Sequence, residues 1–184
     1  MIRVFFALSI SEQFEQTLAD RAVLLREQLF REPLRWIPPQ NYHVTLAFLG
    51  DVSSADIPRL AELGREVASR QPVHRLSVRG MQWFPGVHKP RLLVAALSLS
   101  PSLNKLQADL QQQLNRRGFP IDRQKFRPHI SLARAARGQQ PAGFELAADG
   151  LMFDADELVL FKSELHAQGS RYTPLSVELM GAGY

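Results

Sequence analysis

The stretch HVTLA at residues 43–47 returns almost unchanged as HISLA at residues 129–133. Both copies read histidine, aliphatic residue, hydroxyl residue, leucine, alanine. Side chains alternate between the two faces of an extended strand, so each copy can bury its aliphatic residues on one face. The opposite face then presents an imidazole beside a hydroxyl group. The sequence therefore contains two halves that could together form one acid–base site.

A matching order of elements leads to each copy of the motif. Apolar spacing predicts a strand, an amphipathic helix and then the histidine strand in both halves of the chain. The predicted ranges are 2–9, 14–30 and 42–48 in the first half, then 91–97, 101–117 and 129–134 in the second.

Other segments complete the expected secondary structure. Proline and glycine positions mark the turns between them. We expect a helix at 57–69, strands at 35–37, 76–84, 151–153, 157–165 and 175–180, a bulge at Gly80 and a mobile loop at 135–142.

The repeat predicts an α+β fold of two pseudo-symmetric lobes, each an antiparallel sheet with outer helices, around a central cleft. If a pseudo-twofold axis relates the lobes, both histidines face that cleft. No linker of disordered composition separates the halves, so we expect residues 1–184 to form one bilobal domain.

The composition narrows the class of protein. Of 184 residues, 45% are hydrophobic and 22% are charged, which is ordinary for a globular protein. The absence of cysteine excludes disulfides and thiolate metal sites and fits a cytoplasmic location. The apolar run at 2–10 is too short to span a membrane, and we interpret it as a buried strand. A net charge of +4 favours anionic partners, including nucleic acid.

The two histidines suit acid–base chemistry. An unperturbed imidazole has a pKa of about 6.5, so near neutrality one can donate a proton while the other accepts one. Thr45 and Ser131 could donate hydrogen bonds to the oxygens of a bound phosphate. Arg127 and Arg134 flank the second motif and could add charge-assisted contacts.

Other chemistries fit less well. Neither motif contains an aspartate, a glutamate or a second histidine, so we expect no metal ion and no cofactor. His74, His88 and His166 lack a hydroxyl partner at the same spacing, and we interpret them as surface or loop residues. A serine hydrolase would need a Gly-x-Ser-x-Gly elbow, which the sequence lacks.

At these residues the chain resembles the 2H phosphoesterase superfamily, named for its two His-x-Thr/Ser motifs. It is most similar to the RNA 2′,3′-cyclic phosphodiesterases, also called 2′-5′ RNA ligases. The similarity rests on HVTLAFLG at 43–50 and FRPHISLAR at 126–134, with support from RVFFAL at 3–8 and RYTPL at 171–175. Ser131 stands where threonine is usual in that family.

The resemblance implies a metal-independent hydrolysis of a 2′,3′-cyclic phosphate that leaves a 2′-phosphate. It assigns His129 as the general base and His43 as the general acid, with Thr45 and Ser131 holding the phosphate. The implied partners are RNA 3′ ends or nucleoside 2′,3′-cyclic phosphates, with no membrane and no obligate protein partner. Joining of RNA ends through a 2′-5′ linkage is implied as a secondary activity. The residues alone do not decide which histidine is the acid.

Aromatic side chains could stack on the terminal base. The candidates are Phe48, which we place on the His43 side of its strand, Trp83 and Tyr172 beside Arg171; core packing is the simpler interpretation of Phe48 and Trp83. Two alternatives to the RNA phosphodiesterase stay open. One is a binding module without turnover, and the other is a phosphodiesterase for another small cyclic phosphate or a 2′-5′ oligonucleotide.

Overall fold

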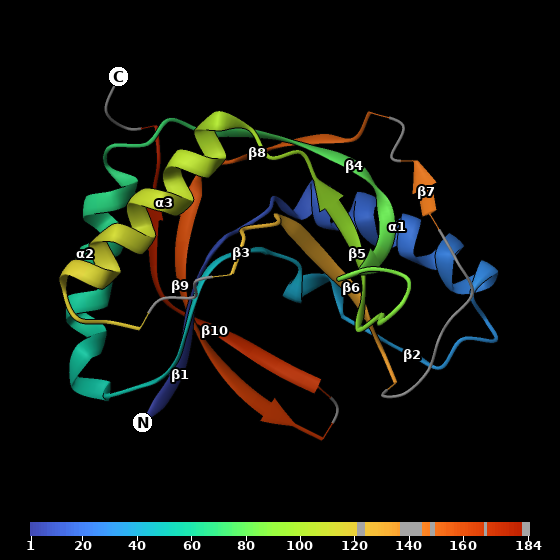
Figure 1. The fold of residues 1–184 in the computed structure, drawn as a ribbon, viewed down its shortest axis with the longest axis horizontal. Coiled ribbons are helices and arrows are strands. Elements are labelled where there is room, and N and C mark those ends of the chain that lie inside the picture. The colour runs from blue at the N-terminus through green and yellow to red at the C-terminus, as the bar shows by residue number, and fades with distance from the viewer. Residues whose placement is uncertain (121–123, 137–144, 148–149, 168, 182–184) are drawn as a thin grey trace.

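The computed structural model of the chain, shown in Figure 1, describes residues 1–120, 124–136, 145–147, 150–167 and 169–181. Its elements, in chain order, are β1 (Ile2–Leu8), α1 (Glu12–Gln28), β2 (Leu34–Trp36), the short 3-10 helix η1 (Pro39–Asn41), β3 (Val44–Val52), the 3-10 helix η2 (Ser54–Asp56), α2 (Ile57–Ala68), β4 (His74–Phe84), β5 (Leu92–Leu97), α3 (Pro101–Arg116), β6 (His129–Ala135), β7 (Glu145–Ala147), β8 (Met152–Ala155), β9 (Glu157–His166) and β10 (Gly169–Leu179).

Antiparallel strands are hydrogen-bonded in the order β10-β9-β1-β3-β6-β5-β4-β7, with β2 added to β6 and β8 added to β4. We call β10, β9, β1 and β3 the first lobe, and β6, β5, β4 and β7 the second lobe. The lobes meet where β3 pairs with β6, at Val44 and Ile130. The α+β class and the two antiparallel lobes expected from the repeat are confirmed.

The pairing at this junction explains why the two motifs converge. An antiparallel pair has a local twofold axis, and directly opposite residues point to the same face. Val44 and Ile130 each follow the histidine of their motif and are both fully buried. His43 and His129 are therefore related by this axis and share the opposite face of the sheet.

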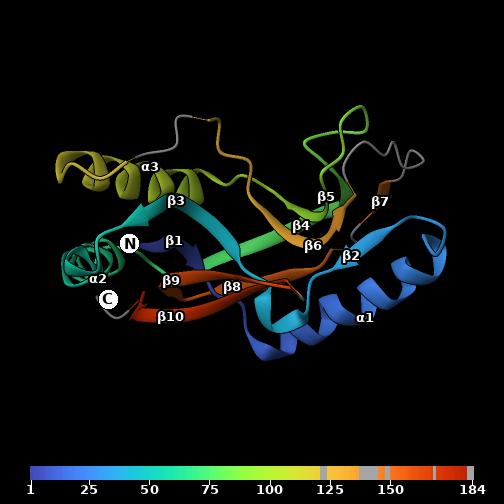
Figure 2. The same ribbon diagram turned by 90° about the horizontal axis from the view of Figure 1, so that it is seen from below.

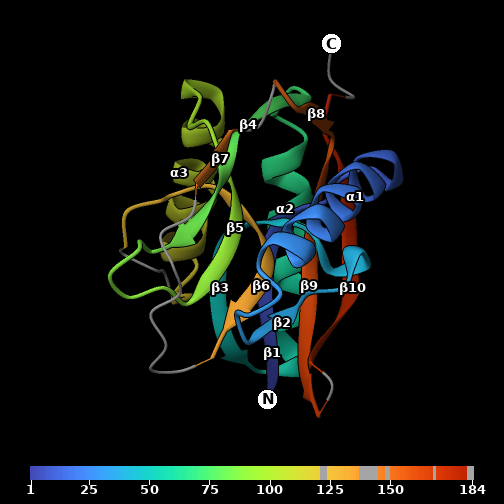
Figure 3. The ribbon, with the colours of Figure 1, turned by 90° about the vertical axis from the view of Figure 1, so that its right-hand side faces the viewer.

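Helices cover the outer face of each lobe, as Figures 1 and 2 show. Helix α1 follows a strand of the first lobe but packs on the second, where Phe14 stacks on Phe153 of β8 with ring centroids 4.2 Å apart. Helix α3 crosses in the other direction, and Gln107 donates a hydrogen bond to the Leu46 carbonyl of β3. Figure 3 shows α1 and α3 far apart, with α3 on the left and α1 on the right of the view. This exchange of helices ties the two lobes together.

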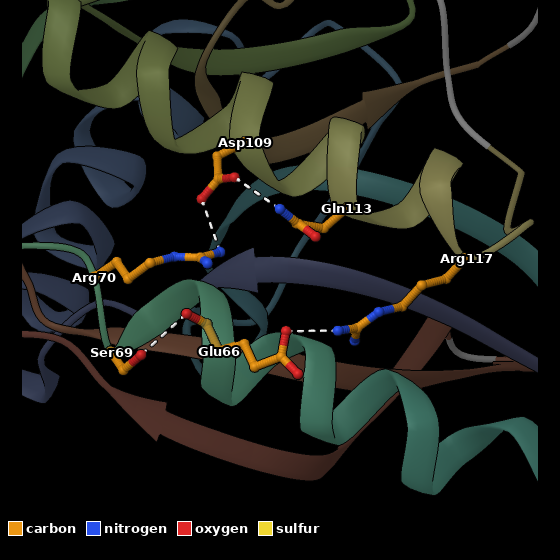
Figure 4. Close-up of polar contacts among 6 residues, drawn as sticks. All are labelled: Glu66, Ser69, Arg70, Asp109, Gln113 and Arg117. Carbon is orange, nitrogen blue, oxygen red and sulfur yellow. Dashed lines mark hydrogen bonds and ion pairs between the residues drawn. The ribbon is translucent and has the colours of Figure 1, made fainter.

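Helices α2 and α3 lie side by side on the first lobe. Figure 4 shows the polar contacts that connect them, an ion pair of Glu66 with Arg117 and one of Arg70 with Asp109. Exposed ion pairs of this kind contribute about 0–1 kcal/mol each. The apolar sides of both helices, including Leu63 of α2, are fully buried and supply most of the stabilisation of this layer.

Local signals set the ends of the predicted helices. The hydroxyls of Ser11 and Ser100 accept hydrogen bonds from the backbone N–H groups of Phe14 and Leu103, as helix-capping serines do. Gly118 follows α3 with a φ of 79°, the left-handed conformation that glycine adopts at a helix C-terminus.

Both histidine strands contain a bulge at the same place in the motif. In the pairing of β3 with β1, Leu46 has no partner. In the pairing of β6 with β5, Leu132 has none. An extra residue reverses the alternation of side chains beyond it. The bulge expected at Gly80 lies one residue earlier, because pairing of β4 with β5 skips Arg79.

Several predicted boundaries were wrong. The strand expected at 42–48 covers Val44–Val52, because η1 occupies the residues before His43, and Gly50 continues the pairing with β1. The last strand begins at Gly169 rather than at 175, since β10 is an edge strand that tolerates Pro174. Of the loop expected at 135–142, Ala135 belongs to β6, and residues 137–142 lie outside the described residues.

Among the residues that the structure describes, no helix combines the length and the apolar character needed to cross a membrane.

Candidate active site

A cleft of about 510 Å³ lies on the shared face of the two lobes. The junction of β3 and β6 places one motif on each side of its floor. Seven of the residues singled out in the sequence line this cleft: His43, Thr45, Phe48, His129, Ser131, Arg134 and Tyr172. The structure therefore brings both histidines and both hydroxyl residues into one site.

The two imidazoles are oriented in the same way. Nδ1 of His43 lies 2.7 Å from the carbonyl oxygen of Asn41, and Nδ1 of His129 lies 2.7 Å from that of Arg127. A carbonyl can only accept, so each ring donates from Nδ1. Each neutral ring then has its lone pair on Nε2, which is free to accept or, when protonated, to donate a proton.

The hydroxyl of Thr45 supports the first histidine. Its Oγ1 lies 3.1 Å from Nε2 of His43 and donates to that nitrogen while the ring is neutral. The second lobe keeps the order of residues but has Ser131 at the equivalent place, where it also lines the cleft. Two hydroxyls thus lie beside the two imidazoles.

The paired bulges bring one further residue of each motif into the site. Strict alternation from His43 would turn Phe48 to the opposite face, so its expected place on the His43 side is correct only because of the bulge. Skipping Leu46 returns Phe48 to the cleft, and skipping Leu132 does the same for Arg134. Phe48 and Arg134 stand five residues after their histidines and are equivalent in the repeat.

An aromatic cluster surrounds His43. Its ring centroid lies 5.0 Å from Phe5 and 5.2 Å from Tyr172, which meets it edge-on, and 6.0 Å from Phe161. Tyr172 is carried by the hairpin of β9 and β10, and Asn41 anchors this hairpin with a 2.8 Å hydrogen bond to the Ser170 carbonyl. The cluster excludes water from one side of His43.

The surroundings of His129 are more open and more basic. Phe84 stacks on its ring with centroids 4.3 Å apart, and the Arg127 guanidinium lies 4.5 Å from the centroid of Phe84. Arg127 also donates a hydrogen bond to the Pro85 carbonyl. The two histidines therefore differ in environment although their backbones are equivalent.

Burial controls the protonation of both histidines. It lowers the pKa of His43 to about 4; the hydrogen bond to Asn41 opposes this shift and the proximity of His129 adds to it. Burial also lowers the pKa of His129, against the hydrogen bond to the Arg127 carbonyl and with a contribution from the Arg127 charge. Both imidazoles are therefore neutral near pH 7 in the ligand-free protein.

Two sequence interpretations were wrong, that of Phe48 as a core residue and that of His74 as a surface or loop residue, and two of the candidate arginines lie outside the cleft. Arg127 faces a separate small pocket beside His129, and Arg171 lines an open depression at the tip of the β9–β10 hairpin. Trp83 is 2% exposed and belongs to the core, whereas Phe48 is 41% exposed and does not. His74 is also buried, with Nδ1 hydrogen-bonded to Ser102, and is not a surface residue.

Several cleft residues were not found from the sequence. Arg3, Arg35, Asn41, Ser163 and Ser170 line the cleft although they lie outside both motifs. Arg3 and Phe5 are two residues apart on β1 and share one face. Once β1 is paired with β3, this spacing indicates that both face the cleft. The hairpin residues gave no such signal, because their place depends on the pairing of β9 with β1 across 150 residues of chain.

No group of three or more histidine, aspartate or glutamate side chains that could hold a metal ion occurs in the described part of the chain. The site offers instead two imidazoles, the hydroxyls of the two motifs and the guanidinium groups of Arg3, Arg35 and Arg134 around one cleft. These groups suit the binding and protonation of a phosphate ester. Two lobes with one His-x-Thr/Ser motif each have the architecture of a two-histidine phosphoesterase.

Comparisons with known proteins agree with this class. The sequence model of the family described as LigT like Phosphoesterase matches residues 8–94 and 97–172. The chain therefore belongs to the LigT-like phosphoesterases, a family of enzymes, and the resemblance noted in the sequence is confirmed.

Three relatives illustrate the similarity. The chain is 31% identical over 151 residues to an RNA 2′,3′-cyclic phosphodiesterase of Geobacillus stearothermophilus, which covers 80% of the chain and 48% of that protein. It is 30% identical over 185 residues to one of Thermus thermophilus, covering 95% and 88% of the two chains. A crystal structure of E. coli LigT complexed with 3′-AMP is 26% identical to the chain and has a TM-score of 0.78. The match covers 97% of this chain and 98% of the LigT chain. The chain thus spans about half the length of the Geobacillus relative and most of the Thermus one.

Proposed function

We propose that this chain hydrolyses the 2′,3′-cyclic phosphate at an RNA 3′ end and leaves a 2′-phosphate. The observation that carries the proposal is the placement of two Nδ1-anchored histidines, His43 and His129, in one cleft with Thr45 and Ser131. The names of the Geobacillus and Thermus relatives and the 3′-AMP bound to E. coli LigT support a nucleotide 3′ end as the substrate.

In the proposed reaction, Nε2 of His129 removes a proton from water, which attacks phosphorus. The bond from phosphorus to the 3′ oxygen breaks, and Nε2 of His43 gives a proton to that oxygen. The hydroxyls of Thr45 and Ser131 hold the non-bridging oxygens, with Arg134 supplying positive charge. If a 5′-hydroxyl end attacked the phosphorus in place of water, the same breaking of the bond to the 3′ oxygen would form a 2′-5′ linkage, which we propose as a secondary activity.

The low pKa of His43 imposes a condition on this assignment. An acid must be protonated before it acts, and the pKa of about 4 leaves the free ring neutral at pH 7. A bound phosphodiester carries a negative charge, which favours imidazolium and raises the pKa of the ring beside it. Binding of the substrate therefore favours protonation of His43, and the protonated ring then acts as the acid.

Replacement of either histidine tests the proposal. We expect His43→Ala and His129→Ala each to lower kcat on adenosine 2′,3′-cyclic phosphate about 10²–10⁴-fold, the usual size of an acid–base contribution. His88→Ala is the matched control because His88 is exposed in the loop after β4, outside the cleft. Chromatography that separates the 2′- from the 3′-phosphate identifies the product, and circular dichroism checks folding.

Three results would contradict the proposal. Full activity of both histidine variants would remove the pair from the chemistry. Loss of wild-type activity in EDTA would contradict a reaction that needs no metal ion. Tight binding of the cyclic phosphate with no product after long incubation would favour the binding module instead.

A further inference from the structure

A second pocket of about 170 Å³ opens beside His129, away from the first lobe. We call it the side pocket. Strand register places it on the same sheet face as the cleft, since Ala96 of β5 pairs with His129 and Val94 pairs with Ser131. Both residues lie beneath it, as does Gln82 of β4, which pairs with Val94. His129 lines both the side pocket and the cleft, so the two adjoin at this residue.

The wall of the side pocket is basic. Arg79, Lys125 and Arg127 line it, and no aspartate or glutamate is among the described residues that do so. Arg79 is the extra residue of the β4 bulge, and such a residue is turned away from the regular alternation of the strand. Neither Arg79 nor Lys125 forms an ion pair within the described part of the chain. Their charges are therefore available to a ligand.

Size and lining restrict what the side pocket can hold. Pockets for whole small molecules usually measure roughly 300–1,000 Å³, so about 170 Å³ is too little for a complete nucleotide. Three cations favour a phosphate, and the apolar part of the lining, which includes Phe84 and the exposed Leu99, suits the carbon atoms of a ribose. A nucleobase attached to that ribose would stay outside.

We propose that the side pocket binds the phosphate and ribose of the RNA backbone on the 5′ side of the terminal nucleotide. This inference rests on the proposed function, because it places the reacting cyclic phosphate between His43 and His129. It makes an oligoribonucleotide, rather than a mononucleoside cyclic phosphate, the preferred substrate. Recognition through the backbone predicts little preference for the sequence of the RNA.

The experiment compares two substrates in the full chain. One is adenosine 2′,3′-cyclic phosphate, which has no phosphate on its 5′ side, and the other is a trinucleotide that ends in the same group. We expect the wild-type protein to have the higher kcat/KM on the trinucleotide. In Arg79→Gln/Lys125→Gln, the ratio of the two kcat/KM values should fall about tenfold, as expected for two lost phosphate contacts.

Salt dependence provides a second readout. The slope of log kcat/KM against log salt concentration for the trinucleotide should become shallower by about 0.7 for each contact removed. Lys105→Gln is the matched control, since Lys105 is exposed on α3 and lies outside both the cleft and the side pocket. For Lys105→Gln, the ratio of the kcat/KM values on the two substrates and the salt slope should equal those of the wild-type protein.

The outcomes separate this inference from the proposed function. Turnover of both substrates with an unchanged ratio in the double variant would overturn the side pocket and leave the proposed function intact. Absence of turnover of either substrate by the wild-type protein would overturn the proposed function. Fluorescence anisotropy with a labelled trinucleotide 2′-phosphate would then still test the pocket, and equal affinity of wild-type and double-variant proteins would overturn it.

Discussion

At the scale of single residues, backbone carbonyls rather than side chains orient the two histidines. Asn41 and Arg127 each accept from Nδ1 of the histidine two residues later. The tautomer of both rings therefore follows from the main chain and does not depend on which side chain precedes the histidine. A substitution of Arg127 changes the charge beside His129 but leaves this hydrogen bond in place.

The low pKa of His43 predicts a pH-dependent stability. The folded-state pKa of about 4 lies below the usual 6.5, so the unfolded chain takes up a proton first as the pH falls. The contribution of neutral His43 to the free energy of unfolding is fully present above pH 6.5. It is lost progressively as the pH falls to 4, and the loss is about 3 kcal/mol for a shift of this size. His43→Gln keeps a neutral donor and acceptor, so its unfolding free energy should fall less over this range.

Urea unfolding at several pH values measures this difference. The burial-lowered pKa values of His74 and His129 act in the same direction in both proteins, so the difference between the two curves reports His43 together with its interaction with His129. Parallel stability curves for the wild-type protein and His43→Gln would show that burial does not depress the pKa of His43.

At the scale of elements, the covering helices approach the sheet closely. Gly64 of α2 faces Phe6 of β1, and a Cβ atom added at Gly64 would lie 3.0 Å from Cε1 of that ring. Phe6 is fully buried and paired on both sides, with Ala47 and with Leu160. The ring has little freedom to move, so the glycine sets the distance between α2 and the first lobe.

Gly64→Ala should therefore destabilise the protein. Helix propensity alone favours alanine by about 1 kcal/mol, whereas overpacking a core costs about 1–3 kcal/mol. We expect a net loss of about 1 kcal/mol in the free energy of unfolding, measured by urea denaturation. Glu62→Ala on the exposed side of α2 is the control and should change it by less than about 0.5 kcal/mol. If Gly64→Ala is more stable than the wild-type protein, the Phe6 ring moves to accommodate the added methyl group.

At the scale of the whole molecule, the site exists only because two lobes face each other. Each lobe supplies one imidazole, one hydroxyl and one residue behind its bulge, Phe48 in the first lobe and Arg134 in the second. The lobes differ where the repeat has diverged, with aromatic rings around His43 and cations near His129. The aromatic rings therefore shield His43 from water, whereas the cations near His129 attract anions.

An anion bound between the lobes should take up protons with it. The pKa values of His43 and His129 are both lowered in the free protein, and a negative charge in the cleft raises them again. Sulfate is a suitable probe because it has no proton to exchange at pH 6. Calorimetric titration in two buffers of different ionisation enthalpy should give a net proton uptake that decreases in His43→Gln. Identical heats in both buffers, after correction for dilution, would contradict the coupling.

The sequence was informative wherever a local rule decides the structure. Capping serines and Gly118 placed the helices, and the doubled His-x-Thr/Ser motif indicated the pair of histidines and the two-lobed fold. Pro174 misled the prediction because a proline is a breaker in a central strand but not at an edge, and edges are known only after the strands are paired.

The chain sequence by itself determined the repeated strand–helix–strand order, the two imidazoles and the hydroxyl beside each, because these follow from residue type and short-range spacing. Only the tertiary structure decided that β3 pairs with β6 at Val44 and Ile130 and that the bulges return Phe48 and Arg134 to the cleft. The physical reason is that register and bulges are set by packing between strands far apart in the chain. The basic side pocket, too, is formed by side chains from β4, β5 and the segment before β6, which no local pattern brings together.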